Sequence, residues 1–458
     1  MDISEINKIN LNNSKVAVLG LGRSGQGAAH LANYLGANVI VSDNNINSEI
    51  TKRSKKLVSL GIEVELGKHT KNILSADLWI VSPGISQKSQ IFLEAKSNGI
   101  PIISEIEFAS WFANHPIVSV TGSNGKTTTV SLIHQMCNSK LMNPKLGGNI
   151  GTAFSNIILE DLKNSPKNRL YILEVSSFQM EAIIHFKPFI SLLLNITPDH
   201  LDRYPSIVEY SEAKLNMIKN QTSKDHIVYN MDDEILKKRI NANEKSVHGF
   251  TLLEKNQTIF YIKNSMIYKN NSELISTKKL KLPGKHNLAN SLAAATVASL
   301  VGATDKQISN AMEYFPGVEH RLEFVSSVSG VSYYNDSKAT NLESVKVALE
   351  SFEKKIYLIL GGKDKGGDFV NLIPYLKQKV KNVIIFGQAR EKISLALRDA
   401  VRLKQVNDLK GAVEFCHLEA TPGDIVLLSP GCASFDQFAN FEERGKNFKK
   451  FVKEIAMA

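Results

Sequence analysis

The sequence predicts an α/β protein of three domains, in which largely parallel sheets are covered by helices. Three observations carry this prediction. The chain has 458 residues, and about 150 residues per domain is typical. Short β-branched runs alternate with segments of helical spacing. Glycine-rich loops directly follow several of those runs, as they do in nucleotide-binding sheets.

The first expected domain, residues 1–105, has the alternating pattern of a Rossmann-like fold. Residues 15–19, 38–42 and 78–81 form short apolar runs typical of buried parallel strands, and residues 27–35 have helical spacing.

The second expected domain, residues 106–317, is a P-loop-type mononucleotide-binding α/β domain. A strand at 117–120 precedes a glycine-rich loop and a helix at 127–136. Further strands are expected at 170–175, 189–196 and 226–230. Residues 258–268 alternate like a hairpin, which predicts a small antiparallel part, and a helix of small residues follows at 291–300.

The third expected domain, residues 318–458, is again Rossmann-like. Its expected strands are residues 356–360, 383–386 and 425–428, with helices between them.

Composition narrows the functional classes. Apolar residues make up 43% and charged residues 22% of the chain, which excludes wholesale disorder. The net charge of +10 is spread along the sequence, without the basic and aromatic clusters of nucleic-acid-binding proteins. No apolar run approaches the roughly 20 residues of a membrane helix, and the first residues do not resemble a secretory signal. Cys137, Cys416 and Cys432 form no CxxC pair, as is usual in a reducing compartment. We therefore expect a cytoplasmic protein that binds neither nucleic acid nor membrane.

The strongest local motif is GSNGKTTT at residues 122–129, between a strand and a helix. Such glycines let the backbone wrap a phosphate at a helix N-terminus. Lys126 could reach the terminal phosphates of a nucleotide, and Thr127 could hold Mg²⁺. The leading glycine of a standard P-loop is absent, because Val120 stands at its position. The alternative is a glycine-rich turn without a ligand.

A second glycine motif, GLGRSG at residues 20–25, follows the first strand, and Asp43 ends the next one. The turn would approach a pyrophosphate, and the acid would bind a ribose hydroxyl. The sequence SPG at 82–84 should lie at the same edge of the sheet. This geometry suits a dinucleotide or a UDP-sugar equally, and a tight turn without a ligand is the alternative.

Three further residues are candidates for a divalent cation site or for ordinary structural roles. Glu174 ends a strand, and His200 follows another, so the two could complete a site near the P-loop. A histidine in a loop is equally consistent with a surface position. Lys214 lies on a helix that begins near residue 207, and by itself it is consistent with a solvated lysine.

In the third domain, polar loops at residues 335–341, 361–368 and 429–438 each follow a strand. We expect them to meet at one carboxyl edge, where α/β folds place their ligands; the alternative is that they are ordinary polar loops. Cys432 is interpreted as a small residue in a tight loop, not as a nucleophile.

Together these segments resemble the Mur ligase family over residues 20–445. GSNGKTTT matches the family's ATP loop, including the absent leading glycine. EVSSFQ at 174–179, HLDRY at 200–204, GKHN at 284–287 and EHR at 319–321 follow in the family's order. NDSKATN at 335–341 and SPGCASFDQF at 429–438 resemble the D-glutamate-adding branch.

The resemblance implies an ATP-dependent ligase that adds D-glutamate to UDP-N-acetylmuramoyl-L-alanine through an acyl phosphate, in peptidoglycan precursor synthesis. It implies catalytic roles for Lys126, His200, Lys214 and Lys338. It also implies two Mg²⁺ ions, one held by Thr127 and the other by Glu174, His200 and Lys214, with a CO₂-derived carbamate on Lys214. We expect a monomer.

The resemblance also assigns binding residues to each substrate. ATP would contact Gly122, Ser123, Asn124, Gly125, Lys126, Thr127, Thr128, Asn287, Asn290, Arg321 and Asp336. The UDP-sugar would contact Gly20, Leu21, Gly22, Arg23, Ser24, Asp43, Ser82, Pro83, Gly84, Asn149 and His200. D-glutamate would contact Lys338, Thr340, Lys365 (aligned in preference to Lys363), Ser434, Phe435 and Phe441.

Three other functions compete with this interpretation. A sibling ligase would add a different amino acid. A dinucleotide-dependent oxidoreductase would use the motif at 20–25 but would leave residues 122–129 unexplained. A P-loop switch or motor protein would use residues 122–129 but would leave both flanking domains without a role.

Overall fold

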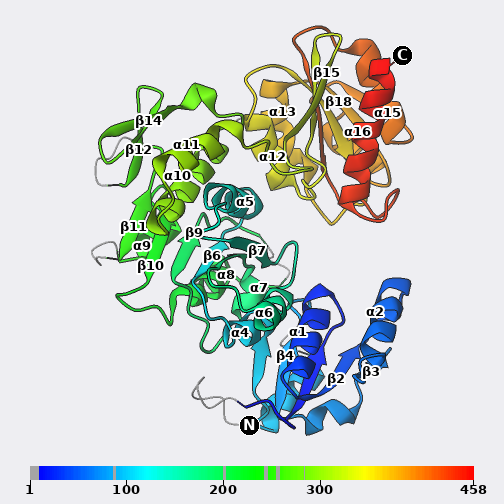
Figure 1. Ribbon diagram of the computed structural model, residues 1–458. Coiled ribbons are helices and arrows are strands. Elements are labelled where there is room, and N and C mark those ends of the chain that lie inside the picture. Colours follow the sequence, from blue (N-terminus) through cyan, green and yellow to red (C-terminus); the bar gives the residue numbers. More distant parts are fainter. Residues whose placement is uncertain are drawn as a thin grey trace. The chain divides into compact units, whose positions relative to one another are not determined.

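The computed structural model describes residues 10–85, 89–199, 203–241, 246–253, 258–282 and 284–457. Its mixed α/β architecture confirms the predicted fold class (Figure 1). The chain forms two compact units. The first comprises residues 1–276 and 290–311, and the second comprises residues 277–289 and 312–458.

The first sheet is entirely parallel, with strand order β3-β2-β1-β4-β5. Its strands are β1 (Lys15–Leu19), β2 (Asn38–Asp43), β3 (Glu63–Leu66), β4 (Leu78–Val81) and β5 (Ile102–Ser104). Helices α1 (Arg23–Tyr34), α2 (Ser48–Val58), α3 (Gln90–Ser97) and α4 (Glu105–Ser110) accompany it. Leu19 pairs with Val81, so the two loops that follow these strands begin side by side.

The second sheet is also parallel, with strand order β11-β10-β9-β6-β8-β7. Its strands are β6 (Ile117–Thr121), β7 (Pro144–Gly148), β8 (Leu170–Glu174), β9 (Ile190–Leu193), β10 (His226–Asn230) and β11 (Val247–Phe250). The accompanying helices are α5 (Lys126–Met136), α6 (Phe154–Asn164), α7 (Ser177–Met180), α8 (Ile207–Leu215) and α9 (Glu234–Arg239). Because β6 lies between β8 and β9, the P-loop after β6 is flanked by the ends of both.

The expected antiparallel part is confirmed, with one strand more than a hairpin. It consists of β12 (Phe260–Lys263), β13 (Met266–Lys269) and β14 (Ser272–Ser276). Helices α10 (Lys285–Leu300) and α11 (Asp305–Tyr314) follow it. Short 3₁₀ helices occur at Lys71–Ser75, Asn216–Ile218, Thr277–Lys279 and Phe369–Leu372.

The first two sheets contribute to one hydrophobic core. Val16 and Val18 of β1 and Tyr171 and Leu173 of β8 belong to the same buried cluster. Helices α1 and α6 pack side by side (Figure 1). A Cβ atom at Gly27 would come within 3.1 Å of the Ala153 Cβ atom, so this glycine permits the close approach.

The sheet of the second unit is mixed, with strand order β15-β16-β20-β17-β18-β19. Its strands are β15 (Glu323–Val328), β16 (Val331–Asn335), β17 (Ile356–Gly361), β18 (Val380–Phe386), β19 (Leu403–Gln405) and β20 (Ile425–Gly431). Edge strand β15 is antiparallel to β16, and the other pairs are parallel. The helices are α12 (Leu342–Glu350), α13 (Ile373–Lys379), α14 (Arg390–Leu397), α15 (Leu409–Glu419) and α16 (Phe441–Met457).

Side chains of β17 alternate between two cores, as the period of a strand requires. Leu358 and Leu360 belong to one cluster, and Tyr357 and Ile359 to the other. Both faces of this sheet are therefore covered.

The three large sheets fall within residues 1–105, 106–317 and 318–458, while the domain boundaries themselves stay a prediction. No helix in the part of the chain that the structure describes is long and apolar enough to cross a membrane.

Candidate active site

The P-loop occupies the turn between β6 and α5. Gly125 is in the left-handed region, with φ 87°. A Cβ atom there would stand 2.5 Å from Oδ1 of Asn290 on α10. A larger residue at position 125 would therefore be strained and would collide with Asn290. The structure thus brings together two of the predicted ATP-binding residues, Gly125 and Asn290.

Asn195 holds the P-loop in shape, and the sequence interpretation assigned it no role. The Asn124 N–H donates to Asn195 Oδ1 at 2.8 Å, and Asn195 Nδ2 donates to the Asn124 carbonyl at 3.1 Å. The Ser123 N–H donates to the Asn195 carbonyl at 2.9 Å. Strand β9 ends at Leu193, earlier than expected, because the following residues turn to make these contacts. Because the expected strand ran to residue 196, Asn195 fell inside it, and the sequence pattern carried no signal of this role.

Two lysines converge on one carbonyl of the P-loop. Lys126 Nζ donates to the carbonyls of Gly122 (2.6 Å) and Ser123 (2.9 Å), and Lys214 Nζ donates to the same Gly122 carbonyl (3.1 Å). Lys214 is only 2% exposed, which contradicts the interpretation of a solvated lysine. Burial, together with the charge of Lys126, holds the pKa of Lys214 well below its ordinary value. Its ammonium is thus easily converted to a neutral amine.

Oxygen ligands for a cation meet beside the P-loop. Thr127 Oγ1 donates to Glu174 Oε2 at 2.8 Å, and Asn149 Nδ2 donates to Glu174 Oε1 at 3.0 Å. Glu174 is buried at the end of β8. Among the described residues, no group of three or more histidine, cysteine, aspartate or glutamate side chains could hold a metal by itself. His200, the other expected ligand, lies outside the described residues.

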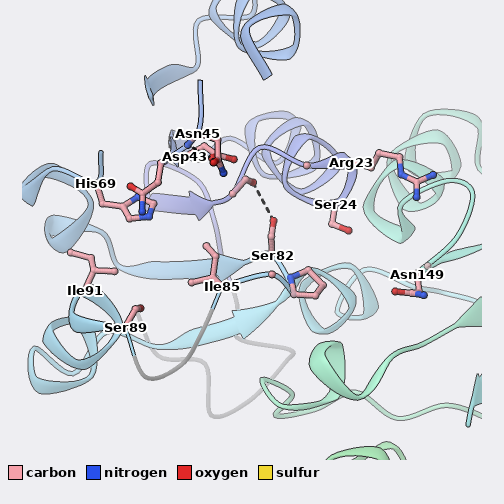
Figure 2. A pocket seen from close by; sticks show the side chains of 16 residues that line it. Arg23, Ser24, Asp43, Asn45, His69, Ser82, Ile85, Ser89, Ile91 and Asn149 are labelled. Atoms are coloured by element: carbon pink, nitrogen blue, oxygen red, sulfur yellow. Dashed lines mark hydrogen bonds between the residues drawn. The ribbon is translucent and has the colours of Figure 1, made fainter. Parts of the chain in front are cut away.

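A pocket of about 600 Å³ lies at the carboxyl edge of the first sheet (Figure 2). It is lined by nine of the expected UDP-sugar residues, namely Gly20, Gly22, Arg23, Ser24, Asp43, Ser82, Pro83, Gly84 and Asn149. The expected meeting of the two loops is confirmed, because Ser82 Oγ donates to the Gly20 carbonyl at 3.2 Å. Leu21 is buried, and its N–H donates to Asp43 Oδ2 at 2.6 Å. Asp43 therefore also shapes the glycine loop.

Seven lining residues were not predicted: Asn44, Asn45, His69, Ile85, Ser89, Ile91 and Gly148. Figure 2 shows Asp43, Asn45 and His69 toward one end of the pocket and Arg23, Ser24 and Asn149 toward the other. Asn149 belongs both to this pocket and to the contact with Glu174.

Arg203 links the pocket to helix α7 and to the residue that follows it. Its Nη1 donates to the Pro83 carbonyl at 2.8 Å, and its Nη2 pairs with Glu181 at 2.6 Å. The guanidinium lies 4.1 Å from the ring centre of Phe178. This arginine stands in the HLDRY segment, but no role had been predicted for it.

In the second unit, the three polar loops meet as expected. The loops follow the neighbouring parallel strands β16, β20 and β17. The Gly431 N–H donates to the Ala339 carbonyl at 2.9 Å, and the Lys363 N–H donates to the Ala433 carbonyl at 2.8 Å. One carboxyl edge therefore carries all three loops.

Two of the predicted ATP-binding residues of this unit interact electrostatically. Asp336 is buried and accepts a hydrogen bond from Ser429 Oγ at 2.9 Å. Burial raises the pKa of Asp336 to about 7, although the nearby Arg321 opposes this. Burial, reinforced by Arg321, lowers the pKa of His286 to about 4. Asn287 is buried near the start of α10.

The predicted D-glutamate residues differ in how accessible they are. Lys338 Nζ lies 5.9 Å from the ring centre of Phe441. Lys363, Lys365 and Phe435 are exposed, Thr340 is half-buried and Ser434 is buried. Cys432 is buried, and burial raises the pKa of its thiol to about 12. A thiol with so high a pKa is unreactive, in keeping with its interpretation as a small loop residue and not a nucleophile.

Arg444 organises these loops, and the sequence interpretation missed it. It is fully buried, and its guanidinium donates to Ser337 Oγ (3.0 Å), the Ser337 carbonyl (2.8 Å) and the Cys432 carbonyl (3.1 Å). Arginine side chains are mostly exposed, so nothing in the sequence pattern indicated that Arg444 would be buried.

Three family models match successive parts of the chain. They are Mur ligase MurD-like, N-terminal domain, at residues 14–104; Mur ligase middle domain, at 120–298; and Mur ligase, glutamate ligase domain, at 320–432.

Curated relatives match over nearly the whole chain. The UDP-N-acetylmuramoylalanine--D-glutamate ligase of Geotalea uraniireducens is 40% identical over 97% of this chain and 98% of its own length. The ligase of the same name from Bacteroides fragilis is 41% identical over 96% of this chain and 100% of its own length.

Solved structures share the fold at low identity. The UDP-N-acetylmuramate-alanine ligase MurC of Thermotoga maritima is 19% identical with a TM-score of 0.60, and the match covers 96% of this chain and 100% of that one. The MurF ligase of Thermotoga maritima, solved with ADP, is 16% identical with a TM-score of 0.60, over 99% and 97% of the two chains. The family models and the near full-length relatives together establish that this chain belongs to the Mur ligase family.

Proposed function

We propose that this chain is an ATP-dependent ligase that joins D-glutamate to UDP-N-acetylmuramoyl-L-alanine. One observation carries the proposal: Asn149 lines the nucleotide-sugar pocket and also bonds Glu174 beside the P-loop. A substrate that fills the pocket from the His69 end would thus bring its far end to the P-loop. The names of the 40% and 41% identical relatives supply the substrates.

The reaction would proceed in two steps. A carboxylate oxygen of UDP-N-acetylmuramoyl-L-alanine attacks the γ-phosphorus of ATP, so that a P–O bond forms and ADP leaves. The amine of D-glutamate then attacks the acyl carbon, phosphate leaves, and the amine loses a proton. Both steps bring anions together, so positive charge must be placed where negative charge develops.

Lys126 supplies part of that charge. Its ammonium is bonded to two carbonyls of its own loop, from which it can turn to the phosphates. The α5 N-terminus adds backbone N–H groups for the phosphate oxygens.

The oxygen donors beside the P-loop fit Mg²⁺. This ion prefers oxygen ligands and usually takes only one or two carboxylates, with water and substrate phosphates completing its shell. The hydroxyl of Thr127 and the buried carboxylate of Glu174 are such donors. When bound, Mg²⁺ would offset the charge of the phosphates. We assign Thr127 to one ion and Glu174, with His200 and a modified Lys214, to a second.

Lys214 is proposed to carry a carbamate. Its neutral amine would attack CO₂, forming an N–C bond and releasing one proton. The product is an anion that can ligate a cation where the lysine itself would repel it. Its burial and lowered pKa support this step, because only the neutral amine is nucleophilic.

Carbamylation is tested with ¹³CO₂, which should give one carbamate resonance that Lys214→Ala removes. Lys214→Ala should be nearly inactive, and added short-chain carboxylates should restore part of the activity. The exposed neighbour Lys219 supplies the control, since Lys219→Ala should retain both the resonance and the activity. An unmodified amine in the active wild-type protein would remove this role.

The second unit is proposed to bind D-glutamate through Lys338, Thr340, Lys365, Ser434, Phe435 and Phe441, and to contact ATP through Asn287, Arg321 and Asp336. Lys338 would pair with the side-chain carboxylate of D-glutamate. Lys338→Ala should therefore raise the KM for D-glutamate at least tenfold, by the loss of one charge-assisted contact. An unchanged KM would exclude this role.

The decisive experiment measures phosphate release with ATP, UDP-N-acetylmuramoyl-L-alanine and each amino acid in turn. We expect release with D-glutamate and little with the others. Release with another amino acid would instead identify a sibling ligase. The proposal also places the protein in the cytoplasm as a monomer, which cell fractionation and analytical ultracentrifugation would test.

A further inference from the structure

Three polar side chains form a hydrogen-bonded chain behind the wall of the pocket. Ser42 Oγ donates to Glu65 Oε1 at 2.5 Å and lies 2.6 Å from Nδ1 of His69. Glu65 also accepts from the hydroxyl of Thr70 at 2.6 Å. Ser42 is fully buried on β2 and does not line the pocket, whereas His69 does. Of Ser42, Glu65 and His69, only His69 can therefore contact a ligand in the pocket.

The chain fixes which nitrogen of His69 carries the proton. Burial alone would raise the pKa of Glu65, but hydrogen bonds from Ser42 and Thr70 outweigh it and hold the pKa below its ordinary value. Glu65 is thus ionised and can only accept. The single hydroxyl proton of Ser42 goes to Glu65, so Ser42 Oγ must accept from His69 Nδ1–H.

The imidazole is neutral at pH 7 in this arrangement. Partial burial lowers the pKa of His69 by more than the carboxylates of Glu65 and Asp43 raise it. A neutral ring with its proton on Nδ1 has a lone pair on Nε2. Nε2 makes no hydrogen bond to any residue in the described part of the chain. His69 therefore presents a hydrogen-bond acceptor, and not a donor, to a ligand.

The position of His69 indicates which part of a nucleotide it would meet. The glycine loop follows β1, Asp43 ends β2 and His69 follows β3, and these strands are neighbours in the order β3-β2-β1. If the diphosphate of a nucleotide binds the glycine loop and its ribose lies near Asp43, the base lies near His69. Figure 2 shows His69 at the end of the pocket away from Ser24 and Asn149.

We propose that His69 selects a uracil base by accepting the ring N3–H at Nε2, and that Ser42 and Glu65 are positioning residues which hold His69 in the required tautomer. This inference rests on the proposed function, because it takes a UDP-linked substrate as the occupant of the pocket. Uracil offers a donor at N3, whereas cytosine offers a lone pair there. An acceptor that faces an acceptor forms no bond and leaves both groups desolvated without a partner.

The test compares UDP, N3-methyl-UDP and CDP by isothermal titration calorimetry on the full chain. The wild-type protein should bind UDP at least tenfold more tightly than either analogue, as expected for one lost buried hydrogen bond. In His69→Ala the three ligands should bind within about twofold of one another. Ser42→Ala should give an intermediate preference, because the ring is retained but its tautomer is no longer fixed.

A half-buried histidine outside the pocket supplies the matched control. His115 bonds the Pro166 carbonyl at 3.1 Å and does not line the pocket. His115→Ala should leave the preference for UDP unchanged. In ¹⁵N spectra, the ring of His69 in the free wild-type protein should show a protonated Nδ1 and an unprotonated Nε2.

The inference is overturned if N3-methylation weakens binding equally in wild type and His69→Ala, or if Nε2 carries the proton. A fourth ligand, 2′-deoxy-UDP, tests contact with the ribose. The inference is also overturned if 2′-deoxy-UDP binds the wild type more weakly than UDP but binds His69→Ala as tightly as UDP, while N3-methyl-UDP stays weaker in both proteins, since His69 would then contact the ribose. Failure of the proposed function has a different signature: UDP would not bind, or phosphate release would not depend on D-glutamate.

Discussion

Glu105, at the start of α4, is a buried carboxyl that should weaken the fold at neutral pH. Its Oε1 accepts from the Ser155 N–H at 2.6 Å, but its Oε2 has no hydrogen-bond partner among the described residues. Burial raises the pKa of Glu105 to about 7 from an ordinary value of 4.5, and the hydrogen bond from Ser155 only partly opposes this. The folded state therefore holds a proton that the unfolded chain releases.

The substitution Glu105→Gln removes this titration and keeps the shape of the side chain. Below about pH 4.5 both states of Glu105 are protonated, and the carboxyl costs nothing. As the pH rises toward 7, the unfolded chain ionises first and stability falls by about 1.4 kcal/mol per pH unit. A pKa difference of about 2.5 gives a loss of roughly 3 kcal/mol above pH 7. Glu105→Gln should recover up to that amount near pH 8 and little near pH 4.5.

Glu107, on the same helix, supplies the matched control. Its carboxylate is fully buried but accepts three hydrogen bonds, from Trp111 Nε1, the His185 N–H and the Phe186 N–H, each at 2.7 Å. Glu107→Gln turns one acceptor oxygen into an NH₂ group that faces an N–H. It should therefore destabilise the protein by about 1–3 kcal/mol.

Tryptophan fluorescence during urea unfolding measures both changes. The chain has two tryptophans, Trp79 and Trp111, and both lie in the first compact unit. Near pH 8 the midpoint should rise for Glu105→Gln and fall for Glu107→Gln. A midpoint for Glu105→Gln that stays at or below that of the wild type near pH 8, or that rises equally at both pH values, would refute the reasoning.

Three further substitutions test single contacts. Gly125→Ala should raise the KM for ATP about tenfold or more, because the new Cβ atom meets Asn290 in a left-handed backbone; an unchanged KM would contradict this geometry. Arg203→Lys should raise the KM for the UDP-sugar severalfold with little change in the KM for ATP, since an ammonium cannot bond the Pro83 carbonyl and the Glu181 carboxylate together as a guanidinium does. Equal changes in both KM values would indicate general damage to the fold. Arg444→Lys should destabilise the second unit by about 2–4 kcal/mol in thermal unfolding followed by circular dichroism, because at least two buried acceptors lose their donor; an unchanged midpoint would show that water replaces them.

Short-range sequence patterns predicted individual strands and the glycine-rich loops that follow them. The runs at Lys15–Leu19 and Leu78–Val81 coincide with β1 and β4, because strands buried on both faces are nearly continuously apolar. The run at His226–Asn230 coincides with β10, in which Val228 and Tyr229 are buried. The loops after β1 and β6 were found from glycines whose positive φ angles are needed at Gly20 and Gly125.

Contacts between distant segments could not be predicted. Asn195 bonds Asn124 across 71 residues, and Arg444 reaches Ser337 across 107. Neither pairing leaves a periodic signal. The same holds for Lys214, whose buried ammonium donates to the P-loop carbonyl of Gly122, 92 residues away. The antiparallel edge strand β15 was also missed, because its residues alternate only weakly between buried and exposed.

The path of the chain has a practical consequence for dissecting the protein. The backbone passes from one compact unit to the other after Ser276, after Ala289 and after Ala311. Helix α10 begins in the second unit and ends in the first, and α11 does the reverse. A single proteolytic nick at any one of these crossings would still leave the two compact units covalently joined through the other two crossings. Expressing residues 318–458 alone would also omit residues 277–289, so fragment studies should keep both stretches of the second unit together.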